Sequence, residues 1–575
     1  MEIGGLSLSE SIYSKISKER KLLQELGELP KWLTTGGYQV LNKGYFWKEK
    51  SLKESYSRIA KTAAQHAPKE TLNNKSWEES FYEILWNGWL AASTPIFNMG
   101  TNKGLPVSCS GGYVPDSIEG FYSSRKETAI LTKHGFGTSG YLGDIRNRGS
   151  IISSGGTASG TLPVFQMFVD DMRKVAQGVT RRGAFAGYLP IDHDDFEEVS
   201  SYLEMYPDDL NIGWIVSQNF IDKLNSKDLD SITRYQKALK IKAITGKGYF
   251  LFNDKVNNLN PQMYKDLGLE VKASNLCTEI TLFSDKDHTF TCVLSSLNLE
   301  KYDEWKDTDT VKIATVFLDC VAQEFINQAK NIDGLEKAVR FTEKSRALGL
   351  GTLGFHSYLQ KNSIPFESFD AHMINNQIFS RIKKESLEAS VFLAKTLGES
   401  EWCKGYGVRN THLLAIAPNS SSSLICGGVS QGIEPIVANS YIQPTAAGEI
   451  TRLNPQLLKL FLDKKIEISD KLIESINENN GSIQHLDFLS DHEKLVFKTA
   501  YEIDQKSIIR LASARQRYIC QAQSINLFFD ANEDEEYISE VHQEAFLDPN
   551  IKSLYYMRTA SGVSASKGVC IACEG

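Results

Sequence analysis

The chain has 575 residues, 41% of them hydrophobic and 23% charged, so it can bury a large core and is expected to divide into two or three domains. Its formal net charge of -8 gives no overall basic field that would favour nucleic acid or an anionic membrane. The sequence shows neither a signal-like apolar run after a basic start nor a stretch of about 18 apolar residues, so we expect a cytoplasmic protein without a direct membrane or nucleic-acid partner.

Three regions are predicted in chain order. Residues 1–92 are expected to be helical, because apolar residues recur at helical spacing in SIYSKISKERKLLQEL and SFYEILWNGWLAAS. Over 93–530, short β-rich runs such as GYFLFND, TFTCVLSSLNL and HLLAIAPN alternate with long amphipathic patterns such as NNQIFSRIKKESLEASVFLAKTL, which is typical of an α/β sheet or barrel. Residues 531–575 end in ASGVSASKGVCIACEG, whose small residues predict a flexible tail.

A glycine-rich stretch, GFGTSG at 135–140, fits the G-x-G-x-x-G pattern of a dinucleotide-binding turn. That fingerprint requires a strand before it and a helix after it. Here the preceding EGFYSSRKETAILTKH is predicted to be helical, so we interpret the stretch as a packing turn. A nicotinamide dehydrogenase is therefore a poor alternative.

The cysteines are too few and too scattered for a disulfide scaffold. Small hydrophobic roles are expected for four of them: Cys320, Cys403, Cys426 and Cys520. Cys277 differs, because in SNLCTEI it lies between Asn275 and Glu279, which would share one face of an extended segment with it. A neighbouring carboxylate disfavours thiolate, so a neutral S–H beside a proton acceptor favours hydrogen-atom chemistry over a protease-like nucleophile.

Four further thiols are candidates for redox chemistry. Cys109 and Cys292 each lie in a short β-like run, and spacing alone leaves open whether they meet. Cys570 and Cys573 form a C-x-x-C pair in the tail, which is either half a zinc site or a dithiol that visits another place. The sequence offers no second ligand pair for zinc. The residues after Met557 would span roughly 40 Å when extended, enough to reach an interior disulfide.

Five stretches, SNLCTEI, TFTCVLSSLNLE, AIAPNSSSSLICGGVSQGIEP, SLYYMRTASG and CIAC, resemble the large catalytic subunit of class I ribonucleotide reductase, in the family's order and over 93–575. The resemblance implies a ten-stranded α/β barrel made of two antiparallel five-stranded halves. A central finger loop would carry Cys277 at its tip. The helical region before residue 93 would support the barrel and a homodimer.

The resemblance also implies roles for the thiols. A thiyl radical at Cys277 would abstract the ribose 3′ hydrogen, Glu279 would take the 3′-hydroxyl proton, and Asn275 would hold the carboxylate or substrate. Cys109 and Cys292 match the pair that supplies two electrons and becomes a disulfide. Cys570 and Cys573 then match the shuttle that reduces this disulfide, itself regenerated by thioredoxin or glutaredoxin.

The radical must originate elsewhere, because no residue of this chain oxidises a thiol unaided. Tyr555 and Tyr556 resemble the tyrosine pair that relays an electron and proton from a separate, metal-containing small subunit. The bland alternative is two aromatic residues in a core strand. The pair favours class I over the cobalamin-dependent class, which shares the barrel and generates its radical in place. No cofactor beyond nucleotide effectors (dNTP or ATP) is expected on this chain, and no metal.

Two nucleotide sites follow from the resemblance. The substrate, a ribonucleoside diphosphate, would contact six residues: Thr94, Ser108, Asn419, Ser420, Ser421 and Ser422. Serines replace the family's usual Glu-Thr-Ser trio in this stretch, and a plain helix-capping loop is the bland alternative. An allosteric specificity site would use Asp116, Arg146, Gln177 and Arg181, although an Arg pair such as 181 and 182 is ordinarily surface charge.

Fewer residues precede Cys109 than the family's additional N-terminal ATP-binding domain would need, so overall-activity control is expected to be absent or to reside on the partner. A non-enzymatic nucleotide-binding regulator on the same barrel is disfavoured, since a binding module needs neither Cys277 and Glu279 nor the Cys109 and Cys292 pair.

Overall fold

The structure is a computed structural model that describes residues 12–72, 74–107, 109–175, 183–445 and 448–560. Its strands are β1 (Leu90–Ala92), β2 (Cys109–Tyr113), β3 (Gly137–Tyr141), β4 (Phe185–Pro190), β5 (Asn211–Ile215), β6 (Tyr249–Leu251), β7 (Phe290–Asn298), β8 (Leu348–Leu353), β9 (Ser440–Thr445), β10 (Gly448–Leu453), β11 (Leu527–Asp530), β12 (Ser553–Leu554) and β13 (Met557–Ala560).

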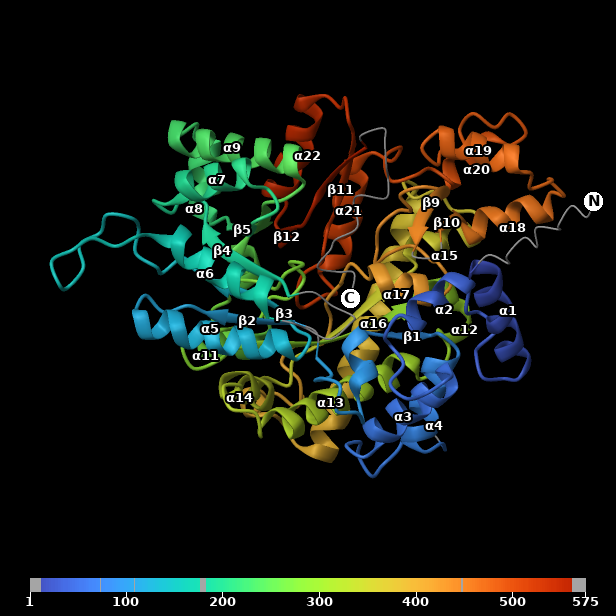
Figure 1. Ribbon diagram of the computed structural model, residues 1–575, viewed down its shortest axis with the longest axis horizontal. Coiled ribbons are helices and arrows are strands. Elements are labelled where there is room, and N and C mark those ends of the chain that lie inside the picture. Colours follow the sequence, from blue (N-terminus) through green and yellow to red (C-terminus); the bar gives the residue numbers. More distant parts are fainter. Residues whose placement is uncertain (1–11, 73, 108, 176–182, 446–447, 561–575) are drawn as a thin grey trace, which may run out of the picture.

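Helices surround these strands (Figure 1). In the first half of the chain they are α1 (Ile12–Glu25), α2 (Thr35–Asn42), α3 (Leu52–Ala64), α4 (Trp77–Trp86), η1 (Thr94–Asn98), α5 (Ile118–Lys133), α6 (Thr161–Lys174), α7 (Phe196–Met205), α8 (Gln218–Asn225), α9 (Leu229–Thr245), α10 (Asn253–Asn258) and α11 (Gln262–Leu267). In the second half they are η2 (Leu299–Lys301), α12 (Tyr302–Trp305), α13 (Thr310–Ala329), α14 (Glu336–Ser345), α15 (Phe355–Lys361), α16 (Phe369–Leu397), η3 (Glu401–Cys403), α17 (Ser420–Ile425), α18 (Pro455–Asp463), α19 (Asp470–Glu478), α20 (Asp491–Val496), α21 (Gln505–Gln516) and α22 (Glu535–Leu547).

The N-terminal part is helical as predicted, except at the end of SFYEILWNGWLAAS. There α4 stops at Trp86 and residues 90–92 form β1. The cause is Gly88, which has φ +66 and donates its N–H to the Leu85 carbonyl, while the Trp89 N–H donates to the Ile84 carbonyl. This left-handed glycine cap ends the helix and turns the chain into the sheet.

The largest sheet contains two sets of parallel strands that meet in antiparallel pairs. Its order is β1-β7-β2-β3-β4-β5-β6-β12, with β8 on the other side of β7. β2 to β6 are parallel neighbours in chain order, and β7 and β8 are parallel to each other. The two sets join where β2 pairs with β7 and where β6 pairs with β12, both antiparallel.

Hydrogen bonds outside the named strands close this sheet into a ring. Residues 412–416 run parallel to β8 through a Leu350 to Leu414 bridge, and 521–525 run parallel to them through an Ile416 to Gln523 bridge. The 525–527 segment then bonds to 555–557, because Tyr555 N–H donates to the Ile525 carbonyl at 2.8 Å. With these segments, β2 to β6 form one half and β7, β8, 412–416, 521–527 and 553–557 form the other, which confirms the expected ten-stranded barrel.

Side chains along the barrel strands alternate between its interior and the helices outside. On β4, Ala186 and Tyr188 belong to the inner buried cluster, whereas Phe185 and Leu189 belong to the outer one. The Phe185 ring stacks on Phe168 of α6, with ring centroids 4.6 Å apart. This period of two is what an extended strand imposes, and it keeps a separate inner layer of side chains within the ring.

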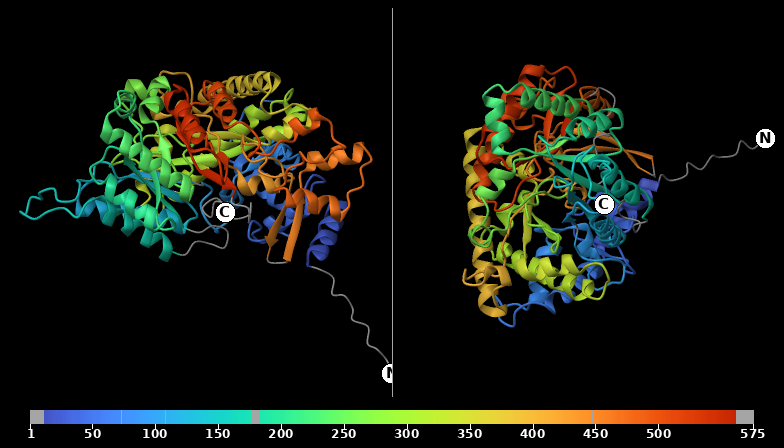
Figure 2. Two further views of the ribbon diagram at one scale, coloured as in Figure 1. Left: turned by 90° about the horizontal axis from the view of Figure 1, so that it is seen from above. Right: turned by 90° about the vertical axis from the view of Figure 1, so that its left-hand side faces the viewer.

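The helices lie outside the ring in several groups. Figure 1 shows α7, α8 and α9 together beside β4 and β5, and the blue N-terminal helices on the opposite side of the molecule. The orange helices α18 to α20 lie at the periphery in Figure 1 and also in Figure 2, and they pack around a small hydrophobic cluster of their own. Within the described residues, no helix is long and apolar enough to cross a membrane.

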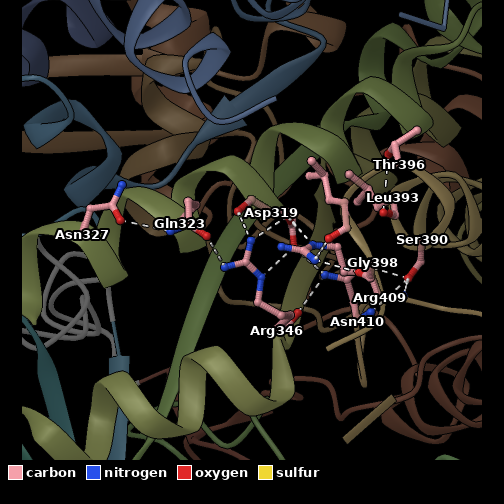
Figure 3. A network of polar contacts seen from close by, with 11 residues as sticks. Asp319, Gln323, Asn327, Arg346, Ser390, Leu393, Thr396, Gly398, Arg409 and Asn410 are labelled. Atoms are coloured by element: carbon pink, nitrogen blue, oxygen red, sulfur yellow. Dashed lines mark hydrogen bonds and ion pairs between the residues drawn. The ribbon is translucent and has the colours of Figure 1, made fainter. Parts of the chain in front are cut away.

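A buried charge network ties the outer helices together (Figure 3). Asp319 on α13 is 1% exposed and forms ion pairs with Arg346 at 2.8 Å and Arg409 at 3.0 Å. Asn410 donates to the same carboxylate at 2.9 Å. Arg346 follows α14 and has φ +48, so one carboxylate fixes the end of that helix and the loop before residues 412–416.

The glycine-rich stretch at 135–140 follows a helix and leads into a strand, whereas a dinucleotide-binding fingerprint follows a strand and leads into a helix. α5 ends at Lys133, the chain turns at Gly135 with φ +98, and β3 begins at Gly137. The stretch thus runs from helix to strand, and its last glycine, Gly140, faces the Phe185 ring, which an added Cβ would meet at 2.9 Å. The interpretation as a packing turn is confirmed.

Candidate active site

The loop 274–280 lies inside the barrel and is suspended from its strands. Its backbone is not extended as predicted, because residues 276–278 form a turn in which Thr278 has φ +70. Hydroxyl groups from the surrounding wall hold its carbonyls: Ser139 donates to Ser274 at 2.7 Å, Tyr188 to Asn275 at 2.6 Å and Ser553 to Thr278 at 3.0 Å. Cys277 is at the tip of this loop and is 7% exposed.

The amide and the carboxylate beside Cys277 meet across the turn. Asn275 Nδ2 donates to Glu279 Oε1 at 3.0 Å, and both side chains are buried. Ser524 Oγ lies 3.0 Å from Glu279 Oε2 and also within hydrogen-bond distance of the Cys277 carbonyl. Polar contacts of this kind let a carboxylate remain in an otherwise apolar interior.

Cys109 and Cys292 lie directly opposite each other where the two halves of the barrel join. They are register partners in the antiparallel pairing of β2 with β7, and both belong to the inner cluster that also contains Cys277. Directly opposite residues of antiparallel strands have Cα atoms about 4.5 to 5.5 Å apart, within the range that a disulfide spans. In the structure both are thiols, and burial raises the pKa of Cys292 well above its usual value.

The two adjacent tyrosines reach the loop cysteine. Tyr555 OH lies 3.5 Å from Cys277 Sγ, and Tyr555 is fully buried. The Tyr555 and Tyr556 ring centroids are 4.0 Å apart. Tyr249 of β6 lies against both rings, and its OH donates to Tyr556 OH at 3.3 Å. A connected set of phenols therefore runs from Cys277 to Tyr556, which is more exposed.

Two of the predicted substrate residues, Thr94 and Asn419, lie beside β7. Asn419 has φ +62, accepts a hydrogen bond from Ser296 Oγ at 2.9 Å and donates to the Thr352 carbonyl at 3.1 Å. Thr94 follows β1, which pairs with residues 295–297 of β7, and its hydroxyl lies 3.0 Å from Tyr45 OH. Ser296 is four residues after Cys292, or about 13 Å along a strand.

Ser420, Ser421 and Ser422 form the first turn of α17, directly after Asn419. Ser420 Oγ donates to Gln431 Oε1 at 3.2 Å. The structure therefore places Asn419 and the turn after it near the end of β7, at Ser296, whereas Thr94 follows β1 toward the cysteine end of β7.

The predicted specificity residues that the structure describes form an ion pair. Arg146 Nε donates to Asp116 Oδ2 at 2.6 Å, and Asp116 lies just before the start of α5. Five predicted residues lie outside the described ranges: Ser108, Gln177, Arg181, Cys570 and Cys573. Among the described residues, no group of three or more His, Cys, Asp or Glu side chains is arranged to hold a metal ion.

Sequence reasoning missed three residues of the site. Tyr249, Tyr188 and Ser524 come from separate strands or segments of the wall, and each touches the loop or the tyrosine pair. The alternation of inward and outward residues along each strand could have indicated two of them, because Tyr188 and Tyr249 carry a hydroxyl group at inward positions of β4 and β6. Ser524 carried no distinguishing local pattern.

The comparisons with known proteins agree with this geometry. The chain matches the family described as ribonucleotide reductase, barrel domain, over residues 107–231, 222–405 and 399–557, and the ribonucleotide reductase all-alpha domain over residues 31–104. It belongs to the ribonucleotide reductase family.

Within that family, the matched relatives are large subunits. A Frog virus 3 protein assigned as a ribonucleoside-diphosphate reductase large subunit is 36% identical, over 86% of this chain and 92% of its own length. The large subunit of Invertebrate iridescent virus 3 is 30% identical, over 90% and 94%. The solved alpha subunit of the Actinobacillus ureae class Id ribonucleotide reductase is 39% identical, with a TM-score of 0.85 over 92% of this chain and 98% of that chain.

Proposed function

We propose that this chain is the catalytic subunit of a class I ribonucleotide reductase, which reduces ribonucleoside diphosphates to 2′-deoxyribonucleotides for DNA synthesis. The observation that carries the proposal is the 3.5 Å contact between Tyr555 OH and Cys277 Sγ at the tip of a loop inside the barrel. A route for an electron and a proton from a partner subunit would end at this thiol. Neither a dehydrogenase nor a binding module needs such an arrangement.

Cys277 would act as the hydrogen-atom carrier. As a thiyl radical it takes the 3′ hydrogen of the ribose, and at the end of the cycle its S–H returns a hydrogen atom to that carbon. Burial suits this task, because a dry site protects a radical from side reactions. Glu279 takes the 3′-hydroxyl proton, and its hydrogen bond from Asn275 keeps the carboxylate aimed across the turn.

Cys109 and Cys292 would supply the reducing equivalents. Their two thiols give two electrons and two protons, the 2′-hydroxyl leaves as water, and an S–S bond forms between the two sulfur atoms. The register that places them opposite each other supports this role. The raised pKa of Cys292, caused by burial, keeps its proton available for the departing hydroxyl.

The nucleotide sites are part of the proposal. Thr94, Ser108 and the stretch Asn419 to Ser422 would contact the substrate, with the last group near its diphosphate. Asp116 and Arg146 would bind an effector triphosphate, and Gln177 and Arg181 would connect that site to the substrate. The ion pair of Asp116 with Arg146 supports a common location for these two residues.

The partners are also proposed from family membership. A radical-generating small subunit carries the metal cofactor, and this chain forms a homodimer. Cys570 and Cys573 reduce the interior disulfide by thiol exchange and are recharged by thioredoxin or glutaredoxin, as a reducing cytoplasm allows. We also propose the division into residues 1–92, 93–530 and 531–575, in which the third region contributes the last barrel strand, 553–557.

The deciding experiment mixes the chain with a class I small subunit and measures deoxynucleotide formation. Cys277→Ala is expected to bind substrate and effector normally and to make no product, because the hydrogen-atom carrier is gone. Cys320→Ala is the matched control, since Cys320 is equally buried but lies in α13 outside the barrel. Turnover by the Cys277→Ala variant contradicts the radical assignment.

Two further assays separate the alternatives. Activity of the chain alone with adenosylcobalamin would identify the cobalamin-dependent class instead. Replacing Cys570 and Cys573 with serine is expected to block cycling supported by thioredoxin while a small dithiol still reduces the interior disulfide. An equal loss with both reductants points to misfolding and contradicts the shuttle role.

A further inference from the structure

The peptide unit between Tyr555 and Tyr556 lies in a gap between two strands. β12 ends at Leu554 and β13 begins at Met557. The outer polar groups of the two tyrosines are bonded to the neighbouring segment, because Tyr555 N–H donates to the Ile525 carbonyl at 2.8 Å and Leu527 N–H donates to the Tyr556 carbonyl at 3.1 Å. The two inner groups, the Tyr555 carbonyl and the Tyr556 N–H, therefore need partners of another kind.

Side chains provide those partners at both ends of the peptide unit. Lys242 Nζ donates to the Tyr555 carbonyl, and Asn526 Oδ1 accepts from the Tyr556 N–H at 3.1 Å. The first comes from α9 and the second from the segment beside β11, so the same amide group is held from two separate parts of the fold.

Lys242 occupies the place where the pairing of β6 with β12 stops. Leu554 pairs with Phe250 at the end of β12. Lys242 Nζ donates to the carbonyl of the next residue, Tyr555, and to the Gly248 carbonyl at 3.0 Å, just before β6. The side chain is fully buried. Burial lowers its pKa to about 7, and its two carbonyl acceptors offset part of the cost of removing the amine from water.

Asn526 is itself fixed by a buried carboxyl group. Its Nδ2 donates to Glu434 Oε1 at 2.6 Å, and both side chains are buried. Because Glu434 takes the amide nitrogen, the amide oxygen must face Tyr556. Glu434 comes from the loop after α17. Arg558, which lies over the Tyr556 ring at 5.6 Å, is close enough for its charge to lower the pKa of Glu434, although burial raises that pKa overall.

We propose that Lys242, Asn526 and Glu434 form a clamp on this peptide unit and are positioning residues for radical transfer through the tyrosine pair. The proposal rests on the proposed function. Holding the amide at both ends sets the spacing of the two rings, whose centroids are 4.0 Å apart, and keeps Tyr555 OH against Cys277. Transfer of an electron and a proton depends steeply on such distances, so a loosened peptide unit slows turnover without altering nucleotide binding.

The first test replaces Lys242 with methionine, which keeps most of its length and removes the donor. With the small subunit present, kcat is expected to fall about 10- to 100-fold while KM and effector binding stay within about twofold, and Lys242→Arg should restore part of the rate. Lys255→Met is the matched control. Lys255 is buried too, and it donates to the Ala545 and Phe546 carbonyls at the end of α22, away from the tyrosines.

The second test exchanges donor and acceptor. Asn526→Asp places a carboxylate against Glu434 and is expected to lower kcat by about the same factor as Lys242→Met. Adding Glu434→Gln restores the hydrogen bond between the two side chains, because the amide of residue 434 now donates to the carboxylate at 526. That carboxylate still offers an oxygen to the Tyr556 N–H. The double variant should recover most of the rate. Two additive losses and no recovery contradict the pairing of these two side chains as the support of the Tyr556 N–H.

Hydrogen exchange of the peptide that spans 553–560 tests the clamp independently of activity. Exchange at Tyr556 is expected to speed up at least about tenfold in Lys242→Met and Asn526→Asp but not in Lys255→Met. Lys242→Met releases the Tyr555 carbonyl, and Asn526→Asp displaces the acceptor of the Tyr556 N–H, so each loosens one end of the same peptide unit. Unchanged exchange and unchanged kcat overturn the clamp. Faster exchange in a chain whose wild type makes no deoxynucleotide overturns the proposed function and leaves the clamp as a structural fact.

Discussion

Replacing Asp319 with asparagine tests how much the buried charge network contributes to stability. The variant keeps the shape of the side chain and removes its charge, so Arg346 and Arg409 lose their shared counter-ion (Figure 3). Burial raises the pKa of this carboxyl, but the two guanidinium groups outweigh burial and lower it to about 2. Relative to the usual value of 3.8, this corresponds to roughly 2 kcal/mol of stabilisation by the ionised form.

The cost of the substitution is larger, because the buried Arg346 and the partly buried Arg409 both lose their only carboxylate partner among the described residues. Breaking a buried pair in this way typically costs about 3 to 5 kcal/mol. An unfolding entropy of about 2.1 cal/mol/K per residue gives roughly 1.2 kcal/mol/K for a chain of this length, so Tm is expected to fall by about 2.5 to 4 °C. Equilibrium unfolding in urea and calorimetry at pH 7 measure the two quantities.

The pH dependence gives an independent check on the same network. Since the folded pKa of Asp319 lies below its unfolded value, its contribution is present above about pH 4 and disappears as the pH falls toward 2. The difference in stability between the wild type and the Asp319→Asn variant should therefore shrink at low pH. Glu544→Gln is the control: its bidentate pair with Arg510 is exposed and should cost less than about 1 kcal/mol. Equal small losses for both substitutions refute the reasoning.

Three other outcomes are expected. Glu279→Gln keeps the shape of the side chain but cannot take a proton, so turnover should fall about 100-fold or more with nucleotide binding unchanged; wild-type turnover in the assay contradicts its role as the base. Gly349→Ala places a Cβ 3.2 Å from Cys292 Sγ and should slow disulfide formation in single-turnover experiments while the protein stays folded; an unchanged rate means that the strand yields. Burial lowers the pKa of Lys255 to about 7, so between pH 7 and about 10 the unfolded chain binds one more proton than the folded chain and the free energy of unfolding should rise with pH. Lys255→Met should reduce this rise, measured as the pH dependence of the urea midpoint. The same pH dependence in the variant and the wild type argues against a neutral buried amine.

Much of the site was predictable from short signatures. The residues around Cys277, around Cys292 and around Tyr555 each form a short continuous stretch of sequence. The barrel that the resemblance implies brings these three stretches together. The pairing of Cys109 with Cys292 was left open by spacing, since nothing local fixes which strands become neighbours. The register of β2 on β7 settles their position.

What the sequence did not predict depends on long-range contacts. The stretch around Cys277 alternates like a strand, but the turn at Thr278 is held by hydroxyls from the barrel wall, so tertiary contacts override the local pattern. Residues 90–92 continued an apolar helical pattern, and only the glycine cap at Gly88 diverts them into the sheet. Lys242 looked like an ordinary helix lysine, because its burial depends on a partner more than 300 residues away, Tyr555.

The position of Cys109 and Cys292 has a mechanical consequence. β2 and β7 form one of the two pairings that join the halves of the barrel, and the two cysteines lie opposite each other across it. Each turnover that oxidises them would link the two halves by a disulfide, and each reduction would break that link. The enzyme's stiffness would thus alternate with its redox state, once per deoxyribose produced.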